Sequence, residues 1–286
     1  MNEKLHEELI STFIHKNYDM VVTECLYLRR SFNDHYFIKT DSNKYIFRVY
    51  VNKKHYIQNA NDLLFELDYL LYLNEMAIPV SIPIVSRSNK TLVTLERLTD
   101  IRYVSMFTFA KGTPLQYGLS CTQAYLLGET IARMHEVSKG FTSCYSRYTL
   151  DVHHLIVEPL QEIEYYTSLY QLGSVSFFQE KADSWIEELL EMPINRLTFG
   201  LVHGDLNPSN IHFCREQGFT LFDFDHCGFG FYIHDLAVTL LSFAPQTFLN
   251  IVEGYQSIRP LLNEEKRFIK TYADILLLKK YKDILN

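Results

Sequence analysis

Two polar stretches of this sequence carry residue types that could do chemistry. LVHGDLNPSNIHF places Gly204, Asp205 and Asn210 between apolar runs, and LFDFDHCGFG follows with Asp223 and Asp225 among aromatic residues. Glycine allows a tight turn before Asp205, and a carboxylate on such a turn can accept a hydroxyl proton as general base. Asn210 and Asp223 offer the oxygen ligands that Mg²⁺ prefers. A base, an amide and a carboxylate together suit phosphoryl transfer, in which metal and positioning supply most of the catalysis.

The first part of the chain predicts strands with one inserted helix. Residues 1 to about 20 carry apolar side chains at helical spacing, and the segments VVTECLYLRR, HYFIKT and YIFRVYV then predict a strand meander. NANDLLFELDYLLYLNEM predicts a helix capped by Asn61 or Asp62. KTLVTLERL and IRYVSMFTF predict two more strands, which gives about five strands in this part.

The later part of the chain is predicted to be mostly helical. TQAYLLGETIARMHEV predicts an amphipathic helix whose inward face carries Leu126, Leu127, Ile131, Met134 and Val137. Further helices are predicted near 157–171, 175–191, 234–243, 246–256 and 263–282. NIHFC and TLFDFD are the only strand-like pieces, and Gly218 between them favours a hairpin. A strand-rich lobe followed by a helical lobe predicts a ligand-binding cleft between the two.

The two polar stretches resemble the catalytic and metal loops of the aminoglycoside phosphotransferase and choline kinase family, small-molecule relatives of the protein kinases. HGDLNPSN followed by FDFD matches the kinase pattern H-R-D-x-x-x-x-N, then D-F-G. YIFRVY, ELDYLLYLNEMAIPVSIPI, RYVSMFTFAKG and HDLAVTL are similar to the homoserine kinase and stress-response kinase branch. The resemblance implies an α+β, protein kinase-like bilobal fold, with an antiparallel-sheet nucleotide-binding lobe at 1–108 and a mainly helical catalytic lobe at 109–286.

The resemblance also implies a role for each matching residue of the polar loops. Asp205 corresponds to the catalytic base, and Asn210 and Asp223 correspond to the Mg²⁺ ligands. His203 and Asp235 correspond to residues that support the catalytic loop.

The nucleotide-binding residues are implied in the same way. Arg48, in FRVY, stands where kinases place a phosphate-contacting lysine, and Glu66 matches the helix partner of that lysine. Residues 107–109, which include Phe107 and Phe109, correspond to the backbone hinge that holds adenine.

Three features depart from the family pattern. Arg48 replaces lysine, and arginine contacts phosphate oxygens with a different geometry. RRSFNDHY, at the position of the phosphate-covering loop, has no glycine, so side chains such as Asn33 or Ser31 would have to contribute. Asp225 replaces the glycine of D-F-G and is a candidate to assist a second metal or the substrate.

Each motif also has an ordinary explanation. HGD alone could be a simple turn and DFD an exposed strand end, but their order and spacing together are hard to explain in that way. Arg48 and Glu66 could form an ordinary surface ion pair, which contributes little to stability. His135 is predicted to be a hydrogen-bonded core residue.

The composition excludes some functions. The net charge of −7 disfavours a general nucleic-acid binder. The five cysteines form no CxxC pair and indicate free thiols. No apolar run is long enough to span a membrane and the amino terminus does not resemble a signal peptide, so we expect a cytoplasmic protein.

We therefore expect an ATP- and Mg²⁺-dependent phosphotransferase that acts on a hydroxyl of a small molecule. Homoserine, choline, an aminoglycoside and hydroxylysine all remain candidate acceptors, and GTP remains an alternative to ATP. Two other functions stay open: a protein Ser/Thr kinase of the stress-response type, and a non-catalytic nucleotide-binding pseudokinase, which the glycine-free loop favours. The sequence makes no prediction of oligomeric state.

Overall fold

The computed structural model describes residues 4–30, 33–50, 59–97, 100–115, 118–170 and 176–285. Ser31, a candidate phosphate contact, lies outside the described residues. The chain forms two compact units. The first unit comprises Met1–Gly112, Phe141–Arg147 and Thr220–Asp225, and the second comprises Thr113–Gly140, Tyr148–Phe219 and His226–Asn286. The first unit therefore extends past residue 108 and includes two later segments of the chain.

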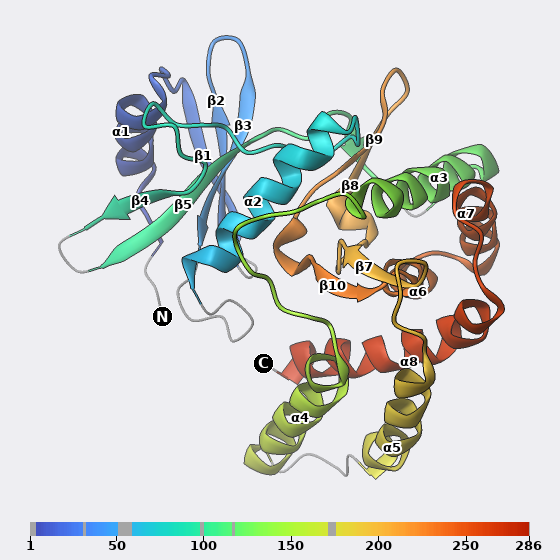
Figure 1. Cartoon of the computed structure of the whole chain (residues 1–286). Coiled ribbons are helices and arrows are strands. Elements are labelled where there is room, and N and C mark those ends of the chain that lie inside the picture. Colours follow the sequence, from blue (N-terminus) through green and yellow to red (C-terminus); the bar gives the residue numbers. More distant parts are fainter. Residues whose placement is uncertain are drawn as a thin grey trace. The chain divides into compact units, whose positions relative to one another are not determined.

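The first unit contains an antiparallel sheet with the strand order β1-β2-β3-β5-β4 (Figure 1). The strands are β1 (Glu24–Arg30), β2 (Asn33–Lys39), β3 (Lys44–Tyr50), β4 (Val93–Glu96) and β5 (Ile101–Thr108). The predicted meander and the two further strands are confirmed, because β-branched and aromatic residues between turn formers are a strong strand signal.

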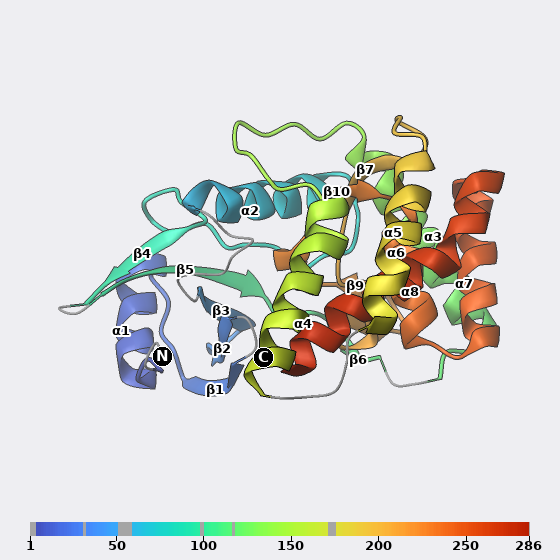
Figure 2. The same cartoon turned by 90° about the horizontal axis from the view of Figure 1, so that it is seen from below.

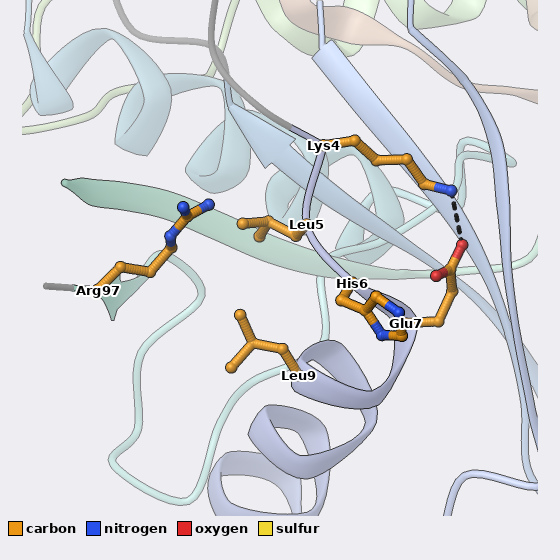
Figure 3. Close-up of a pocket in the computed structure, with 6 residues that line it drawn as sticks. All are labelled: Lys4, Leu5, His6, Glu7, Leu9 and Arg97. Atoms are coloured by element: carbon orange, nitrogen blue, oxygen red, sulfur yellow. Dashed lines mark ion pairs between the residues drawn. The ribbon is translucent and has the colours of Figure 1, made fainter. Parts of the chain in front are cut away.

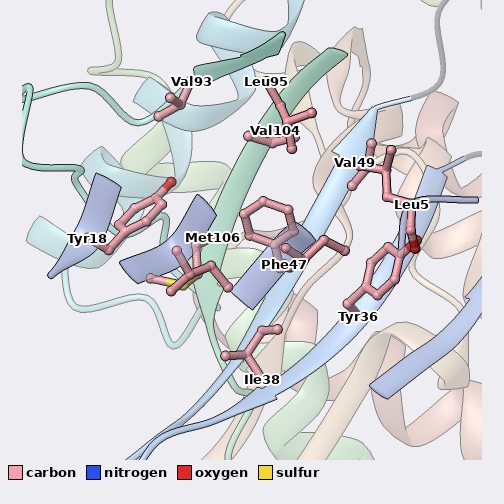
Figure 4. Close-up of a cluster of buried hydrophobic side chains, with 12 residues drawn as sticks. Leu5, Tyr18, Tyr36, Ile38, Phe47, Val49, Val93, Leu95, Val104 and Met106 are labelled. Carbon is pink, nitrogen blue, oxygen red and sulfur yellow. The ribbon is translucent and has the colours of Figure 1, made fainter. Parts of the chain in front are cut away.

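Helix α1 (Glu7–Tyr18) covers one face of this sheet and closes an apolar core with it (Figure 4). The core consists of Leu5, Ile10, Ile14, Tyr18, Tyr36, Ile38, Phe47, Val49, Val93, Leu95, Val104 and Met106. Successive side chains of a strand point to opposite faces. Since Phe47 and Val49 point into this core, Arg48 between them must point to the other face.

Helix α2 (Ala60–Glu75) lies on that other face (Figure 2). The helix begins after Asn59, whose side chain accepts a hydrogen bond from Asn61 N at 2.8 Å, while the Asp62 carboxylate accepts one from Asn59 N at 3.1 Å. This reciprocal arrangement is a capping box. The prediction that Asn61 or Asp62 is the N-cap was therefore wrong, because both residues already belong to the helix.

Two later segments join the first unit by packing against its elements. The ring of Phe141 contacts the rings of Phe65, Tyr69 and Tyr72 along α2, with centroids 5.1 to 5.4 Å apart. Leu221 forms a parallel β-bridge with Val80 through backbone hydrogen bonds to either side of it. These contacts explain why residues 141–147 and 220–225 do not belong to the helical unit.

The second unit is mainly helical, and its predicted helices are confirmed. They are α3 (Cys121–Ser138), α4 (Glu158–Leu169), α5 (Ser176–Glu191), α6 (Ile233–Ser242), α7 (Pro245–Ile258) and α8 (Asn263–Leu285), with a π-helix at His153–Val157 before α4. Helices α4, α5 and α6 all pack on α8 (Figure 1). The predicted inward face of α3 was wrong for Leu126, whose side chain is exposed, but Leu127, Ile131 and Met134 are buried. Among the described residues, no helix combines the length and apolar character needed to cross a bilayer.

The second unit also contains short strands that the sequence did not predict. Strands β7 (Phe199–Val202) and β10 (Gly228–Phe231) form an antiparallel pair. The expectation of only two strand-like pieces was wrong, since these strands are short and contain glycine, which weakens the strand signal. The predicted piece NIHFC forms β8 (Ile211–Cys214). Of TLFDFD only Thr220 and Leu221 belong to a strand, β9 (Gly218–Leu221), and its last residues enter a 3₁₀ turn at Phe224–His226. Strands β8 and β9 join β6 (Thr113–Pro114) in a sheet ordered β6-β8-β9.

Helices α3 and α7 approach so closely that their backbones meet at two glycines. A Cβ on Gly128 would lie 2.0 Å from the carbonyl oxygen of Ile251, and a Cβ on Gly254 would lie 1.9 Å from that of Tyr125. Neither distance is compatible with a side chain, and the atoms that each Cβ would meet belong to the backbone, which cannot rotate away. The crossing of these helices therefore requires glycine at both positions.

We expect Gly128→Ala and Gly254→Ala each to lower the free energy of unfolding by about 1–3 kcal/mol, the usual cost of overpacking. This loss should outweigh the gain of about 1 kcal/mol in helix propensity from glycine to alanine. Urea denaturation measures the free energy of unfolding of each variant. Gly118→Ala is the control, since nothing lies within 4 Å of its Cβ position. Unchanged stability of both helix variants would contradict the close crossing.

Candidate active site

The first unit buries an ion-pair cluster on the face of the sheet opposite α1. The Arg48 guanidinium donates from Nη1 to Glu66 Oε1 at 2.7 Å and from Nη2 to Asp223 Oδ1 at 2.8 Å. Arg48 and Glu66 are 4% and 0% exposed, so they do not form a surface pair. We call Arg48, Glu66 and Asp223 the arginine cluster. It joins β3, α2 and the segment after β9, three parts of the chain that are far apart in sequence.

The charge on Arg48 is maintained despite its burial. Burial alone would lower the pKa of the guanidinium, but the carboxylates of Glu66 and Asp223 outweigh this effect and raise the pKa well above its ordinary value. Two carboxylates thus share one permanent cation. This arrangement holds the Asp223 carboxylate in a fixed orientation.

The backbone of Asp223 is in the left-handed region, with φ at 67°. Aspartate tolerates this conformation better than most residues other than glycine. The left-handed turn lets the chain leave β9 and present the Asp223 side chain to Arg48, within the first unit. A β-branched residue at this position would strain the turn.

Asp225 is held by two groups of the first unit and is 4% exposed. Its Oδ2 accepts a hydrogen bond from Asn33 Nδ2 at 3.1 Å, and its backbone carbonyl accepts one from Arg147 Nη2. Asn33, the first residue of β2, thus reaches the loop 223–225 through its side chain. A role for Asp225 at a second metal stays a prediction.

Arg147 is a residue that sequence reasoning missed. It is buried, and its Nη1 donates to the backbone carbonyl of Asp62 at 2.6 Å while its Nη2 bonds the carbonyl of Asp225. Arg147 therefore fixes the loop 223–225 to the first turn of α2. No local pattern in YSRYTL distinguishes this arginine, because its partners lie far away in sequence.

The predicted hinge lies at the end of β5. The Phe107 ring lies 4.7 Å from the Arg48 guanidinium carbon, and the Phe109 ring packs edge-on against Phe37 with centroids 5.6 Å apart. The backbone N–H groups of Thr108 and Phe109 already donate to Ile82 O and Lys44 O. Both amides are used within the first unit, so an adenine ring would have to be recognised by other backbone groups of this segment.

The second unit holds the loop 203–210, which we call the HGD loop. Gly204 has φ at 82°, and a Cβ there would lie 2.1 Å from the backbone carbonyl oxygen of His226. Only glycine fits this turn without strain or collision. His203 is fully buried and its Nδ1 accepts the backbone N–H of Asp205 at 3.3 Å.

The Asp205 carboxylate is held by two amides. Asn210 Nδ2 donates to Asp205 Oδ2 at 2.8 Å and also to its backbone carbonyl, and Asn207 Nδ2 donates to Oδ1 at 2.9 Å. Because Asn210 uses its amino group on Asp205, its amide oxygen remains available for other partners, and among the described residues it accepts only a weak contact from Ser209 Oγ at 3.5 Å. An amide oxygen fixed in this way fits the ligand preference of Mg²⁺.

Asn207 was not identified from the sequence as a site residue. Besides Asp205, it binds the Ser209 backbone N–H through Oδ1 at 3.0 Å and so starts the 3₁₀ turn Pro208–Asn210. The pair Asn-Pro is a known turn signal and could have indicated it. The same side chain therefore shapes the HGD loop and orients its carboxylate.

Asp235, at the start of α6, supports the HGD loop by accepting hydrogen bonds from its backbone. Its Oδ2 accepts the backbone N–H of His203 and its Oδ1 that of Gly204, both at 2.9 Å. His135 Nε2 lies 2.9 Å from Oδ2, and His135 Nδ1 lies 2.8 Å from the Tyr255 hydroxyl. The prediction that His135 is a hydrogen-bonded core residue is confirmed.

The hydrogen-bond network continues to α7 and beyond. Arg259 Nη1 donates to the Tyr255 hydroxyl at 3.0 Å, and Arg259 Nη2 forms a buried ion pair with Glu265 at 2.7 Å. Tyr255 can then donate to His135 Nδ1, which leaves His135 Nε2–H to donate to Asp235. The chain of bonds assigns one tautomer to His135 and connects Arg259 to the HGD loop.

Burial and hydrogen bonding set the charges in this network. Burial lowers the pKa of His135, so its imidazole is neutral at pH 7. Burial alone would raise the pKa of Asp235, but the hydrogen bond from His135 is the main effect that outweighs it, and the pKa falls to about 2. Since His135 is neutral, it stabilises the carboxylate as a hydrogen-bond donor rather than as a cation.

A hollow of about 390 Å³ at the start of α1 belongs to neither group of site residues (Figure 3). It is lined by Lys4, Leu5, His6, Glu7, Leu9 and Arg97. Lys4 and Glu7 form an ion pair at one side of it, at 2.7 Å. The paired charges give this hollow no evident chemistry.

The structure thus collects the predicted site residues into two groups, one in each unit. The arginine cluster, with Phe107 and Asp225, lies in the first unit, and His203, Asp205, Asn210 and Asp235 lie together in the second. A family model described as the phosphotransferase enzyme family matches residues 30–262, a range that includes every residue of both groups.

The chain belongs to the phosphotransferase enzyme family. This confirms the family predicted from HGDLNPSN and FDFD, and makes the protein a phosphotransferase. Amicoumacin kinase of Bacillus subtilis (strain 168) is 24% identical over 241 residues, which cover 82% of this chain and 68% of that protein. Homoserine kinase of Gluconobacter oxydans (strain 621H) is 25% identical over 252 residues, 84% of this chain and 74% of that protein.

Solved structures of other kinases share the fold of this phosphotransferase. A microcompartment-associated aminopropanol kinase has a TM-score of 0.80 at 23% identity, covering 96% of this chain and 89% of that one. An amicoumacin kinase in complex with AMP-PNP and Ca²⁺ also has a TM-score of 0.80, at 18% identity, covering 97% and 85%. The predicted α+β fold, with an antiparallel-sheet N-terminal region and a helical C-terminal part, is confirmed.

In this phosphotransferase, Asp235→Asn should lower the free energy of unfolding, and the size of this loss should depend on pH. The folded pKa of about 2 lies below the ordinary value of 3.8. The carboxylate therefore contributes about 2 kcal/mol that is fully present above about pH 4 and is lost as the pH falls through 2. We expect the difference in unfolding free energy between wild type and Asp235→Asn to narrow over that range, as measured by urea denaturation at pH 7, 4, 3 and 2.

The control is Asp183→Asn, an exposed position on α5. Its stability should follow the wild type at each pH. A constant difference between wild type and Asp235→Asn from pH 7 to pH 2 would show that the Asp235 carboxylate is not held ionised by the HGD loop.

Proposed function

We propose that the protein transfers the terminal phosphate of ATP, with Mg²⁺, to a hydroxyl of a small molecule. The observation that carries this proposal is the pair of amides on Asp205, because Asn207 and Asn210 each hold one carboxylate oxygen. A carboxylate fixed in this way is oriented toward a bound hydroxyl without the cost of ordering its side chain. Membership of the phosphotransferase enzyme family supports the same reaction.

In the proposed reaction, the acceptor oxygen attacks the terminal phosphorus and forms a new O–P bond. The bond between that phosphorus and the bridging oxygen breaks, and ADP leaves with the electron pair. The hydroxyl proton passes to the Asp205 carboxylate. General bases of this kind contribute about 10²–10⁴-fold to a rate.

Asn210 and Asp223 are the proposed metal ligands. Both offer oxygen, and each is fixed by its own unit, Asn210 through Asp205 and Asp223 through Arg48. When bound, Mg²⁺ would neutralise charge on the phosphates. The proposal requires both residues to serve one nucleotide.

Arg48 is the proposed phosphate contact. Its guanidinium is protonated and already oriented by Glu66. Arginine carries five N–H donors, so Arg48 can keep its hydrogen bond to Glu66 and still donate another to a phosphate oxygen. Residues 107–109, which include Phe107 and Phe109, remain the proposed adenine hinge. Adenine would bind to those of their backbone groups that form no hydrogen bond within the first unit.

The proposed acceptors are amino alcohols, hydroxylated amino acids and antibiotics. The names of the related kinases give homoserine, amicoumacin and aminopropanol as substrates of those proteins. Homoserine and aminopropanol each carry a hydroxyl group and an amine. The proposal for this chain is therefore the class and not one member of it.

Purified Asp205→Asn and Asp223→Ala should remain folded and lose turnover by at least about 10²-fold. The assay couples ADP formation to a panel of hydroxylated amino acids, amino alcohols and antibiotics with Mg·ATP. Asp274→Asn, an exposed position on α8, is the control and should retain wild-type turnover.

Full turnover by either site variant would contradict the assigned role. Phosphorylation of lysate protein without any turnover of the small-molecule panel would instead assign the chain to the protein kinases. ATP binding without phosphate transfer to either class would show a non-catalytic protein.

A further inference from the structure

Helix α8 carries a lysine, Lys279, near the HGD loop, and the proposed reaction assigns this lysine no role. Lys279 is half-buried, and its Nζ lies 3.5 Å from Nδ1 of His226. The backbone carbonyl of His226 is the group that packs against Gly204 at the turn before Asp205. Lys279 therefore lies in the second unit, close to the loop that carries the proposed base.

A second imidazole, that of His234 on α6, is bonded to the HGD loop. His234 Nε2 lies 3.2 Å from the carbonyl oxygen of Gly204, to which it can donate. Burial, aided by the charge of Lys279, lowers the pKa of His234 to about 4, against the opposing effects of Asp235, the Gly204 carbonyl and Asp205. The charges of Lys279 and Asp205 thus both act on one side chain that is bonded to the HGD loop.

The charge of Lys279 is not balanced in the described part of the chain. The contact with His226 is its one hydrogen bond among the described residues, and no carboxylate there forms an ion pair with it. Lys282, one turn later, is buried but lies 3.4 Å from Glu162 Oε2. Ammonium groups taken out of water are normally paired. Lys279 is partly removed from water and has no carboxylate partner among the described residues.

We propose that Lys279 binds a carboxylate of the acceptor, so that the phosphorylated molecule carries an acidic group as well as its hydroxyl. This inference rests on the proposed function and narrows its substrate class. A carboxylate would complete the pairing of Lys279 and orient the acceptor in the second unit while its hydroxyl approaches Asp205. The acceptor class is then the hydroxylated amino acids rather than simple amino alcohols or aminoglycosides.

The terminal phosphate of the nucleotide is the other oxyanion that a lysine here could meet. The two sources differ in which kinetic constant depends on Lys279. A contact with the acceptor changes the KM of carboxylate-bearing acceptors alone. A contact with the phosphate changes the KM of ATP or kcat for every acceptor.

The test uses pairs of acceptors that differ by a carboxylate, such as homoserine and 3-aminopropan-1-ol, within a wider panel of such pairs. The wild type should prefer the carboxylate-bearing member of the pair that it uses best. Lys279→Met should raise the KM of that member by about 10- to 100-fold, the loss expected for one charge-assisted hydrogen bond. The KM of the member without a carboxylate should stay unchanged.

Two further variants keep the result interpretable. Lys279→Arg retains the charge and should restore most of the preference, which a purely structural role would not explain. Lys280→Met, the exposed neighbour on α8, should behave as the wild type. Unfolding midpoints of all variants are measured first, and Lys279→Gln replaces Lys279→Met if the latter does not fold.

Three outcomes would overturn the inference. Equal use of both members of each pair, or a preference for the amino alcohol, refutes it while leaving the proposed function intact. A change in the KM of ATP or in kcat for all acceptors assigns Lys279 to the phosphate instead. Absence of phosphate transfer to the whole panel by the wild type refutes the proposed function itself, together with the inference that rests on it.

Discussion

The Asp235 carboxylate is the interaction on which the proposed catalytic loop depends. Two consecutive backbone N–H groups, of His203 and Gly204, point at its two oxygens, and a neutral His135 donates to the same group. Buried N–H groups need partners, and the tight glycine turn removes the usual ones from the loop itself. The buried Asp235 carboxylate therefore makes this turn possible, and the turn orients Asp205.

The first unit solves a related problem with the opposite charge. Strand alternation puts Arg48 on the face away from the apolar core, where a buried guanidinium requires carboxylates to balance it. Glu66 and Asp223 fulfil this requirement from α2 and from the segment after β9. One cation thus links three elements, of which α2 and the segment after β9 also meet through the rings of Tyr69 and Phe224. Replacing Arg48 with a neutral residue would remove the positive charge that balances Glu66 and Asp223.

Local sequence patterns predicted most of the fold and the residue types of the site. Periodicity located the sheet and the helices, and the spacing of HGDLNPSN and FDFD singled out Asp205, Asn210 and Asp223. The strands β7 and β10 were missed because four residues with glycine carry little signal. Arg147 and the bond between His135 and Tyr255 were missed for a different reason. The partners of Arg147 lie 85 and 78 residues away, and His135 and Tyr255 are 120 residues apart, so no local sequence pattern indicates these pairs.

The glycine crossing of α3 and α7 has a consequence for how this phosphotransferase tolerates change. His135 lies on α3 and Tyr255 on α7, immediately after Gly254, so the hydrogen bond between them spans the same crossing. Where two backbones touch, the helices cannot slide without breaking contact, whereas a layer of side chains would absorb small shifts by rotating. Substitutions on the outer faces of α3 and α7 should therefore not disturb the HGD loop. The alignment of the two helices that support this loop is fixed by backbone atoms, which mutation of the surrounding side chains does not alter.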